Sequence, residues 1–527
     1  MLLIDTKTMM HRQILLLKGR VCVVEIPVAL IFLLASTVTH GQESGSKGIP
    51  LHEVRVVPRV SISETISDNV RLSNVNQQGD QITQVSPGIL VTSVEGPLKG
   101  YFDYSFNQIA YAQNASPSQH QNALTTYATL EVIENFLSVD VNGVISQQSI
   151  SAFGPQSTDN SALNANQTEV SNYRISPFVH GRIGSLANYE ARFNRAVIQS
   201  DAATGSGVAS MDGFVKMSGI GGHQRIGWSV DASRQHLDYS AGRSTDDDRL
   251  NLSLSYAIGP QFNMAVYGGL ERSNFSTVDQ ESYATSGIQV SWLPSALTRL
   301  AASRNNRSFG SEHHLNFEHR TGRTSWRFSD SYDIAATPSQ IGSASQGTLY
   351  DTLYSQFSTI EPDPAARAQL VNAVLQSNNL KPTTRVISSY LTSAISLQRR
   401  QDFAVELNGV RSILTLMVSR SEGRRLDTLS SGVDDFTQSS VVRQHGLSVN
   451  FLHRLTPDYS LGFLASQQIS SGETSLQDAT LHLLNISLTG KIGKRTSTSV
   501  GVRRVVSSGN VAPYAESAVT LNLIVQF

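Results

Sequence analysis

The sequence has few charged residues and no excess of either sign. Of its 527 residues, 16% are charged, with 41 Lys and Arg against 42 Asp and Glu, which gives a formal net charge of −1. Average soluble domains have about 25% charged residues. The lack of a positive excess argues against a nucleic-acid-binding protein, which needs a basic surface. The apolar content of 39% is too low for a helical membrane protein and too high for a typical disordered chain.

Cysteine is nearly absent, because Cys22 is the only one in the chain. Disulfides within the chain and cysteine metal sites are therefore excluded. Cys22 lies in an N-terminal segment where basic residues precede an apolar run at 21–38. This order is typical of a secretory signal peptide. An uncleaved membrane anchor is the alternative, but Glu25 and Pro27 shorten the apolar run below the roughly 20 residues that a spanning helix needs.

Long hydrophobic runs are missing after this segment, whereas strict alternation of apolar and polar residues is frequent. Leu250, Leu252, Leu254 and Tyr256 alternate with Asn and Ser. Because successive side chains of a strand point to opposite faces, this pattern predicts a strand with one apolar and one polar face. The same alternation recurs at 391–398, 447–451 and 459–465.

The connections between the predicted strands alternate in length. Short turns such as 258–261 and 455–458 alternate with long polar connections such as 149–167 and 421–440. Counting back from the C-terminus gives about 22 strands, in a range of 18–22, which predicts an all-β fold, a transmembrane antiparallel up-and-down β-barrel. Such a barrel must close, because hydrocarbon cannot satisfy the hydrogen bonds of an open sheet edge. A soluble β-sandwich is the alternative, but its strands are usually shorter.

Three parts of the chain follow from these patterns. We expect a signal peptide at 1–41, a short periplasmic N-terminal segment at 42–53 and the outer-membrane barrel at 54–527. One long connection breaks the strand pattern, because its apolar residues have helical spacing. We therefore predict a short helical insertion at 345–382, which either folds into the lumen as a constriction or caps the surface.

The C-terminal strand carries a further signal. Val519, Leu521, Leu523 and Val525 alternate with mostly polar residues, and the chain ends at Phe527. A final amphipathic strand that ends in Phe resembles the assembly signal of bacterial outer-membrane proteins, in which the aromatic ring lies in the interfacial girdle. Phe527 is therefore the candidate membrane-assembly signal. We expect a location in the bacterial outer membrane, with outer-membrane lipid and the barrel-assembly machinery as partners.

A set of short segments is distributed along the chain: 57–70, with its Thr-x-x-Asp-Asn strand end, 85–89, 101–104, 175–179, 362–367, 398–400 and 409–416. Together they resemble the outer-membrane barrels associated with the PEP-CTERM/exosortase system, a family found beside exopolysaccharide biosynthesis genes. The resemblance covers about residues 50–527. It implies a Gram-negative outer-membrane location and a link to polysaccharide export or surface display, and it supplies no activity.

No catalytic constellation stands out, so we expect no enzyme, no cofactor and no metal. His313 and His314 are adjacent, but neighbours on a strand point to opposite faces and cannot chelate one ion. Arginine at mid-bilayer on the lipid face costs about 2–4 kcal/mol, so arginines deep in the membrane are expected to point to the lumen. The candidate lumen-lining residues are Arg192, Arg327, Arg411 and Arg503, which either line a path for an anionic polymer or pair with carboxylates such as Asp103, Asp140, Glu190, Glu318 and Glu406.

Taken together, these features predict a pore or conduit associated with exopolysaccharide export, because a wide barrel is open unless something fills it. Under this prediction the partners are an anionic polysaccharide and periplasmic export proteins, and no nucleic acid. Two alternatives stay open: a non-transporting structural or assembly component of the outer membrane, and a general porin.

Overall fold

Twenty-two antiparallel strands of 10 to 17 residues make up most of the computed structural model. The structure describes residues 54–93, 95–202, 207–220, 225–240, 242–335, 390–392, 395–426, 434–474, 477–511 and 513–527. The strands are β1 (Val54–Ser67), β2 (Asp80–Ser93), β3 (Leu98–Tyr111), β4 (Gln119–Ile133), β5 (Leu137–Ser149), β6 (Gln167–Ile183), β7 (Ala187–Ser200), β8 (Val208–Ile220), β9 (Ile226–Tyr239), β10 (Thr245–Gly259), β11 (Phe262–Ser273), β12 (Glu281–Ser295), β13 (Thr298–Arg307), β14 (Gly310–Arg320), β15 (Thr324–Ala335), β16 (Ser396–Asn408), β17 (Ser412–Arg425), β18 (Val441–Arg454), β19 (Tyr459–Ser471), β20 (Ala479–Lys491), β21 (Thr496–Gly509) and β22 (Tyr514–Gln526).

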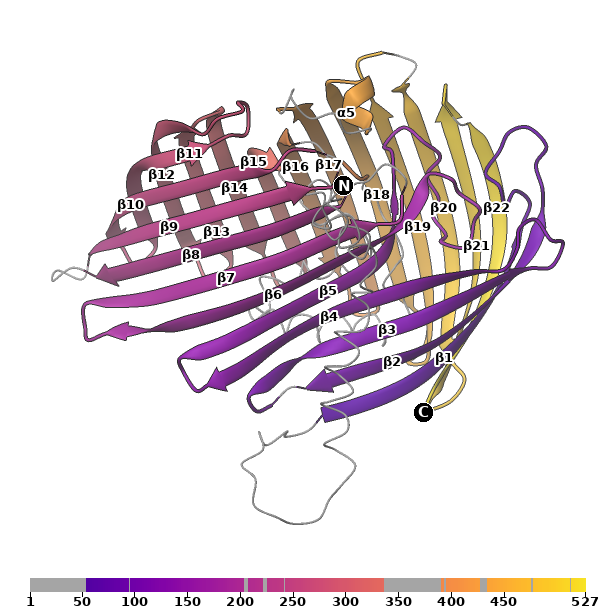
Figure 1. The fold of residues 1–527 in the computed structure, drawn as a ribbon. Coiled ribbons are helices and arrows are strands. Elements are labelled where there is room, and N and C mark those ends of the chain that lie inside the picture. The colour runs from indigo at the N-terminus through magenta and orange to yellow at the C-terminus, as the bar shows by residue number, and fades with distance from the viewer. Residues whose placement is uncertain are drawn as a thin grey trace, which may run out of the picture. The chain divides into compact units, whose positions relative to one another are not determined.

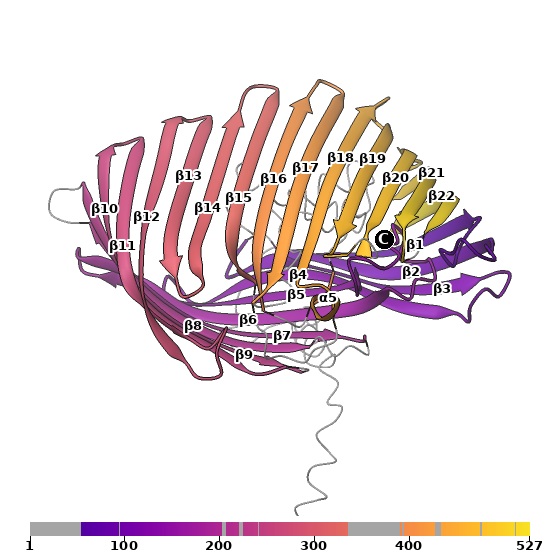
Figure 2. The same cartoon turned by 90° about the horizontal axis from the view of Figure 1, so that it is seen from above.

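The sheet closes on itself. Each strand pairs antiparallel with the next one in the sequence, and the first and last strands also pair, with Arg59–Ser67 opposite Ala518–Gln526. Figures 1 and 2 show the strands following one another around a ring. Closure gives the backbone groups of both terminal strands a partner, which an open edge in hydrocarbon would lack. The predicted all-β antiparallel barrel of about 22 strands is therefore confirmed.

The two rims of the barrel differ. At the terminal rim, where β1 begins and β22 ends, the connections are short turns, such as 184–186, where Gly184 has a φ of +55°. Glycine adopts this left-handed conformation without a steric penalty. At the opposite rim, here called the loop rim, most connections are longer, including 68–79 and 150–166. The β13–β14 connection at 308–309 is the shortest of them, a tight hairpin at the loop rim.

One short helix, α5 (Asp435–Gln438), occurs in the described chain, in the β17–β18 connection at the loop rim (Figure 1). Its N-cap Asp434 accepts a hydrogen bond from the backbone N–H of Phe436 at 3.0 Å. Within the described residues, no helix is long and apolar enough to cross a membrane. The predicted signal peptide 1–41, the segment 42–53 and the helical insertion 345–382 lie outside the described residues.

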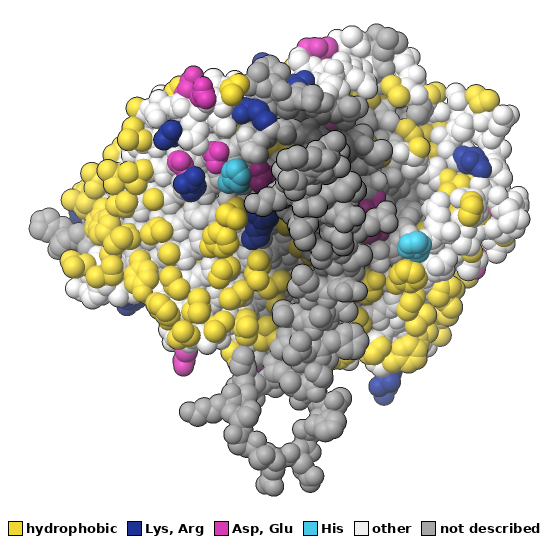
Figure 3. Space-filling view, viewed as in Figure 1, with side chains coloured by type: hydrophobic (Ala, Val, Ile, Leu, Met, Phe, Trp, Pro, Cys, Tyr) yellow, Lys and Arg dark blue, Asp and Glu magenta, His cyan; other side chains and the backbone are white. Residues whose placement is uncertain are grey.

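The outer face of the wall carries an apolar belt. On β10, the outward side chains of Leu250, Leu252 and Leu254 are 44–59% exposed. Figure 3 shows such hydrophobic side chains gathered over the lower wall, with charged side chains more frequent above them. A spanning strand needs about 9–11 residues, and most of these strands are longer. They therefore extend past the belt at the loop rim, where the outer face becomes polar.

The inner face is lined mainly by hydroxyl and amide side chains. Asn251, Ser253 and Ser255 on β10 alternate with the outward leucines, as the sequence pattern predicts. The strand order and register place Thr65 of β1 beside Thr520 of β22 on this same face, with their hydroxyl oxygens 3.3 Å apart. Polar residues can face the lumen because water or polar neighbours satisfy them there.

Candidate functional site

The inner wall holds arginines that are paired with carboxylates. Arg192 on β7 places Nη1 2.6 Å from Oδ2 of Asp140 on β5 and Nε 3.2 Å from Oε1 of Glu190. Its guanidinium carbon lies 3.9 Å from the centroid of the Phe178 ring, a cation–π contact. Arg192 thus lies on the inner face, with its charge balanced by two acids.

The other predicted lumen residues differ in their surroundings. Arg327 on β15 also faces inward, with Nε 3.5 Å from Oε1 of Glu318 on β14. Arg411 lies outside the strands, in the turn between β16 and β17, where its carbonyl accepts the N–H of Arg454 at 2.7 Å. The expected wall position of Arg411 therefore has to be corrected, because β16 ends at Asn408 and β17 begins at Ser412.

Arg503 on β21 connects the wall to a loop. Its Nη2 lies 2.8 Å from Oε1 of Glu516 on β22, and its Nη1 lies 2.6 Å from Oδ2 of Asp159. Ser67 Oγ also donates to Glu516 at 2.8 Å. The Arg503 and Glu516 side chains are only 11% and 3% exposed. Because Asp159 belongs to the β5–β6 connection, the Arg503–Asp159 ion pair holds that connection against the inner wall.

The β5–β6 connection, residues 150–166, is called the latch loop below. Its carbonyls at Gln156, Asn160 and Ser161 accept hydrogen bonds from side chains on three strands of the wall, β22, β4 and β3. Ala162 and the β1–β2 residue Leu72 pack against a buried apolar surface of β19–β22, formed by Leu464, Leu483, Val505 and Tyr514. The loop therefore lies across part of the mouth of the barrel at the loop rim.

Helix α5 holds the other side of the latch loop. Asp435 accepts a hydrogen bond from Ser151 Oγ at 2.6 Å and one from the N–H of Ala152 at 2.7 Å. Next to these bonds, apolar side chains from four separate segments form one buried cluster. Its members are Ala152, Phe153, Ala335, Tyr390, Phe436 and Val442.

The pKa of Asp435 is raised from an ordinary value of 3.8 to about 6, chiefly by burial. The bonds from Ser151 and Ala152 oppose this rise, and the nearby Asp434 carboxylate adds to it. A carboxyl whose pKa is higher in the docked state than in the free state favours docking when it is protonated. Its contribution to latch-loop docking is therefore complete below the free-state pKa and is lost as the pH rises through about 6.

We expect latch-loop docking to strengthen on acidification. After correction for the intrinsic exchange rate, the protection of the Ala152 amide against hydrogen exchange should rise as the pH falls from 7 to 5. Asp435→Asn, which is neutral throughout, should abolish this pH dependence while other latch-loop amides stay protected. An unchanged pH dependence in the variant would show that another group is responsible.

A second charged cluster surrounds Arg307, the last residue of β13. Its guanidinium contacts Glu271 at 3.0 Å, Glu312 at 2.9 Å and Asp333 at 3.2 Å. The Arg307 side chain is 6% exposed and the Glu271 side chain is fully buried. One cation therefore balances three acids from β11, β14 and β15 on the inner wall near the loop rim.

The same cluster contains the described residues best placed for a metal ion. Glu312, His314 and Asp333 offer ligand atoms that all lie within 4.8 Å of one another. However, Arg307 already donates to both acids, and His314 Nε2 lies 3.0 Å from Glu312 Oε1. These contacts make an ion-pair network that satisfies the three side chains. His313 lies on the opposite face, stacked against Tyr332 at 5.9 Å.

Sequence reasoning missed the residues that shape the mouth. Asp159, Asp435 and Arg307 are not predicted as site residues, although each makes several close polar contacts. Their only local signal is the acidic pair at 434–435 ahead of Phe436, a weak helix-start pattern. Phe527 lies at the terminal rim, 63% exposed, and its N–H donates to the Pro58 carbonyl at 2.9 Å. Its role in assembly stays a prediction.

A closed barrel with an apolar belt and no open edge is a membrane-spanning structure, and barrels of this kind belong to the bacterial outer membrane. No family model and no curated protein matches the sequence. Solved structures with similar folds include the FrpB iron transporter (F5-1 variant, apoprotein) from Neisseria meningitidis, at 11% identity and a TM-score of 0.49, with 89% of this chain and 81% of that chain covered.

The siderophore receptors PirA from Pseudomonas aeruginosa and from Acinetobacter baumannii are also similar. Both are 8% identical, cover 90% of this chain and 80% and 81% of their own, and have TM-scores of 0.44 and 0.46. At these identities the likeness concerns the fold alone and says nothing of a ligand. The chain is a 22-stranded β-barrel of the bacterial outer membrane.

Proposed function

We propose that the barrel is a gated outer-membrane conduit for a hydrated, hydroxyl-rich polymer, and that this polymer is an exopolysaccharide. The observation that carries the proposal is the inner wall, where hydroxyl and amide side chains line the strands and several arginines are paired with acids. Arg59, Arg192, Arg327, Arg400 and Arg503 all have carboxylate partners. The resemblance to barrels of the PEP-CTERM/exosortase system supports a polysaccharide as the solute.

The paired arginines refine the predicted substrate. An anionic polymer is attracted by unpaired cations, whereas a paired guanidinium presents little net charge to the lumen. On the described wall, the Arg307 cluster even has more acids than cations. We therefore propose a neutral or weakly charged polysaccharide in preference to a strongly anionic one. Periplasmic export proteins remain proposed partners.

The latch loop supports a gate at the loop rim. It is fixed on one side by Arg503 and on the other by Asp435, so opening requires both sets of contacts to break. A permanently fixed latch loop would instead favour the second candidate, a non-transporting structural component of the outer membrane. Whether these contacts can break therefore distinguishes a gated conduit from a closed scaffold, and the difference is measurable.

Planar-bilayer recording of the refolded barrel tests the proposal. We expect low conductance in the intact protein and a large, stable conductance when residues 152–164 are replaced by a short Gly-Ser linker. Neutral dextran fragments should then block the current reversibly, and sulfated dextran should block no better. A latch-loop variant that folds but never conducts would contradict the conduit and favour the structural role. Block by sulfated dextran alone would contradict the neutral substrate.

A further inference from the structure

The outer face of β16–β18 carries a charged patch at the upper edge of the apolar belt. Register and alternation place Arg399, Glu422 and Arg443 in one row across the three strands. The next row toward the belt contains Gln401, Arg420 and His445. Arg424 also faces outward, two residues after Glu422 on β17. We call Arg399, Arg420, Glu422, Arg424 and Arg443 the outer arginine patch.

Positive charge is in excess within this patch. Glu422 has Arg424 at 2.7 Å, Arg443 at 3.6 Å and Arg420 at 3.7 Å, and Arg399 has Asp330 of β15 at 3.4 Å. The three arginine side chains around Glu422 are 40–60% exposed, so their guanidinium groups keep donors free to face outward. By comparison, the outward Arg234 on β9 has a carboxylate of β10 beside it, Asp248 at 3.5 Å. The four guanidinium groups thus face Glu422, Asp330 and the nearby Glu473 of the β19–β20 connection. The patch keeps a net positive charge, which favours an added anion.

Apolar surface begins in the next row below the patch. Phe403, Val418 and Leu447 occupy that row across the same three strands, and they are 39–49% exposed. A hollow of about 500 Å³ opens on this side of the wall, lined by Phe403, Val418, Leu447, Ile469, Arg420 and His445. A cationic edge and an apolar hollow therefore share one surface, with Arg420 and His445 at the boundary.

We propose that this surface is a binding site for a lipid that carries a phosphate headgroup. Guanidinium groups donate paired hydrogen bonds to phosphate oxygens, and basic residues beside a membrane-spanning surface recognise anionic headgroups. The phosphate would contact Arg420, Arg424 and Arg443, and an acyl chain would lie along the hollow below. A free phosphate ion would contact the arginines but not the hollow, so only a lipid would place an acyl chain against the residues of the hollow.

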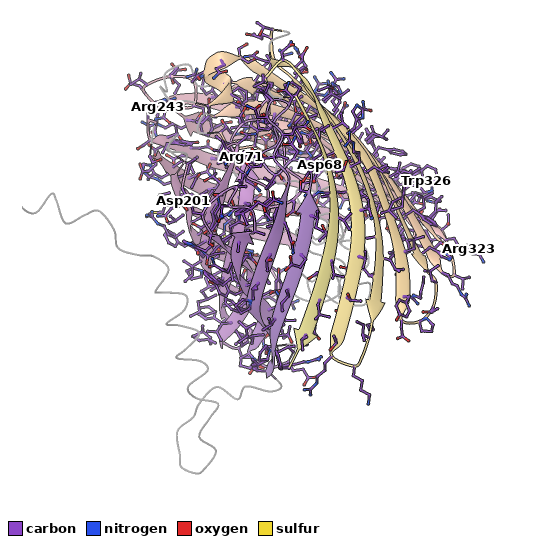
Figure 4. All side chains as sticks on the ribbon, turned by 90° about the vertical axis from the view of Figure 1, so that its right-hand side faces the viewer. Asp68, Arg71, Asp201, Arg243, Arg323 and Trp326 are labelled. Carbon is purple, nitrogen blue, oxygen red and sulfur yellow. The ribbon has the colours of Figure 1, made fainter. Side chains whose placement is uncertain are left out.

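The site contains a natural fluorescent reporter. Trp326 projects from the outer side of β15 (Figure 4), and its ring centroid lies 6.2 Å from that of Phe403, which lines the hollow. The chain has three tryptophans, so Trp228→Phe with Trp292→Phe leaves Trp326 alone. A lipid with brominated acyl chains quenches a tryptophan that its chains touch. Quenching of Trp326 therefore reports an acyl chain at the hollow.

The experiment compares brominated phosphatidic acid with brominated phosphatidylcholine, each mixed into micelles of the full barrel. We expect phosphatidic acid to be preferred about tenfold at Trp326, because basic residues beside a membrane surface attract anionic headgroups. Arg420→Gln, Arg424→Gln and Arg443→Gln combined should remove the preference. Arg234→Gln, which alters a paired outer arginine on β9, should leave the preference for phosphatidic acid intact. Each variant should also keep the folded band on unheated gels.

Three results would overturn the proposal. Equal quenching by the two lipids at Trp326 would exclude headgroup selection. The same preference at Trp292, measured with Trp228→Phe and Trp326→Phe, would show a general attraction to the barrel. Binding of inorganic phosphate in lipid-free detergent, together with no quenching of Trp326 by brominated phosphatidic acid, would show a headgroup-sized anion site only. The proposal does not depend on whether the lumen conducts.

Discussion

Arg503→Met is expected to release the Asp159 side of the latch loop and to destabilise the barrel. The variant removes the partner of Glu516, whose side chain is 3% exposed and would keep only the bond from Ser67. Breaking a buried pair from one side costs about 3–5 kcal/mol, because an uncompensated charge stays buried. Asp159 loses its 2.6 Å contact in the same variant. Urea unfolding should show the loss of stability, and limited proteolysis should cut within 150–166.

Two further variants separate these effects. Arg503→Met with Glu516→Gln removes the buried charge, so stability should largely return while the Asp159 side of the latch loop stays released. Asp159→Asn alone should expose the latch loop to protease with a stability loss of about 1 kcal/mol. Equal protease resistance in all three variants would show that Arg503 does not hold the loop. In that case the bonds to Asp435 and the hydrogen bonds from the strand side chains to the latch-loop carbonyls would have to hold it.

The barrel could be predicted from the sequence because a bilayer imposes a two-residue period on every strand. The prediction is sound where one face meets lipid, as at Leu250–Tyr256, and weaker where both faces are polar. The residues 421–440 look like a loop in the sequence, but β17 continues to Arg425. There the outward positions hold Arg420, Glu422 and Arg424, so the alternation disappears although the strand continues past the belt.

The candidate site was predictable in part. The cost of burying Arg in lipid places Arg192, Arg327 and Arg503 on the inner face, where the structure also has them. Their partners are not all local. Asp159 is 344 positions from Arg503, and Asp435 is 284 positions from Ser151. A single sequence contains no periodicity that links such positions, so the mouth of the barrel could not be derived from it.

Arg307→Met is expected to cause a loss of stability as large as that in the Arg503 variant. The substitution leaves the acids of Glu271, Glu312 and Asp333 without their shared cation. Glu271 is fully buried, so its charge must stay unpaired or become protonated, and either outcome costs about 3–5 kcal/mol. The midpoint of urea unfolding should fall, and the folded band on unheated gels should be lost at a lower temperature.

The matched control is Arg327→Met, on the same inner face. Arg327 and Glu318 are each 23% exposed and 3.5 Å apart, so water already screens them and the expected loss is about 1 kcal/mol or less. Glu271→Gln combined with Arg307→Met should recover part of the stability, since it removes the buried charge that Arg307 compensates. If Arg307→Met and Arg327→Met cost the same, burial of Glu271 does not set the strength of the cluster. If the double variant is the less stable one, Glu271 contributes through packing or through its bond with Ser308 at 3.0 Å, and the ion pair is secondary.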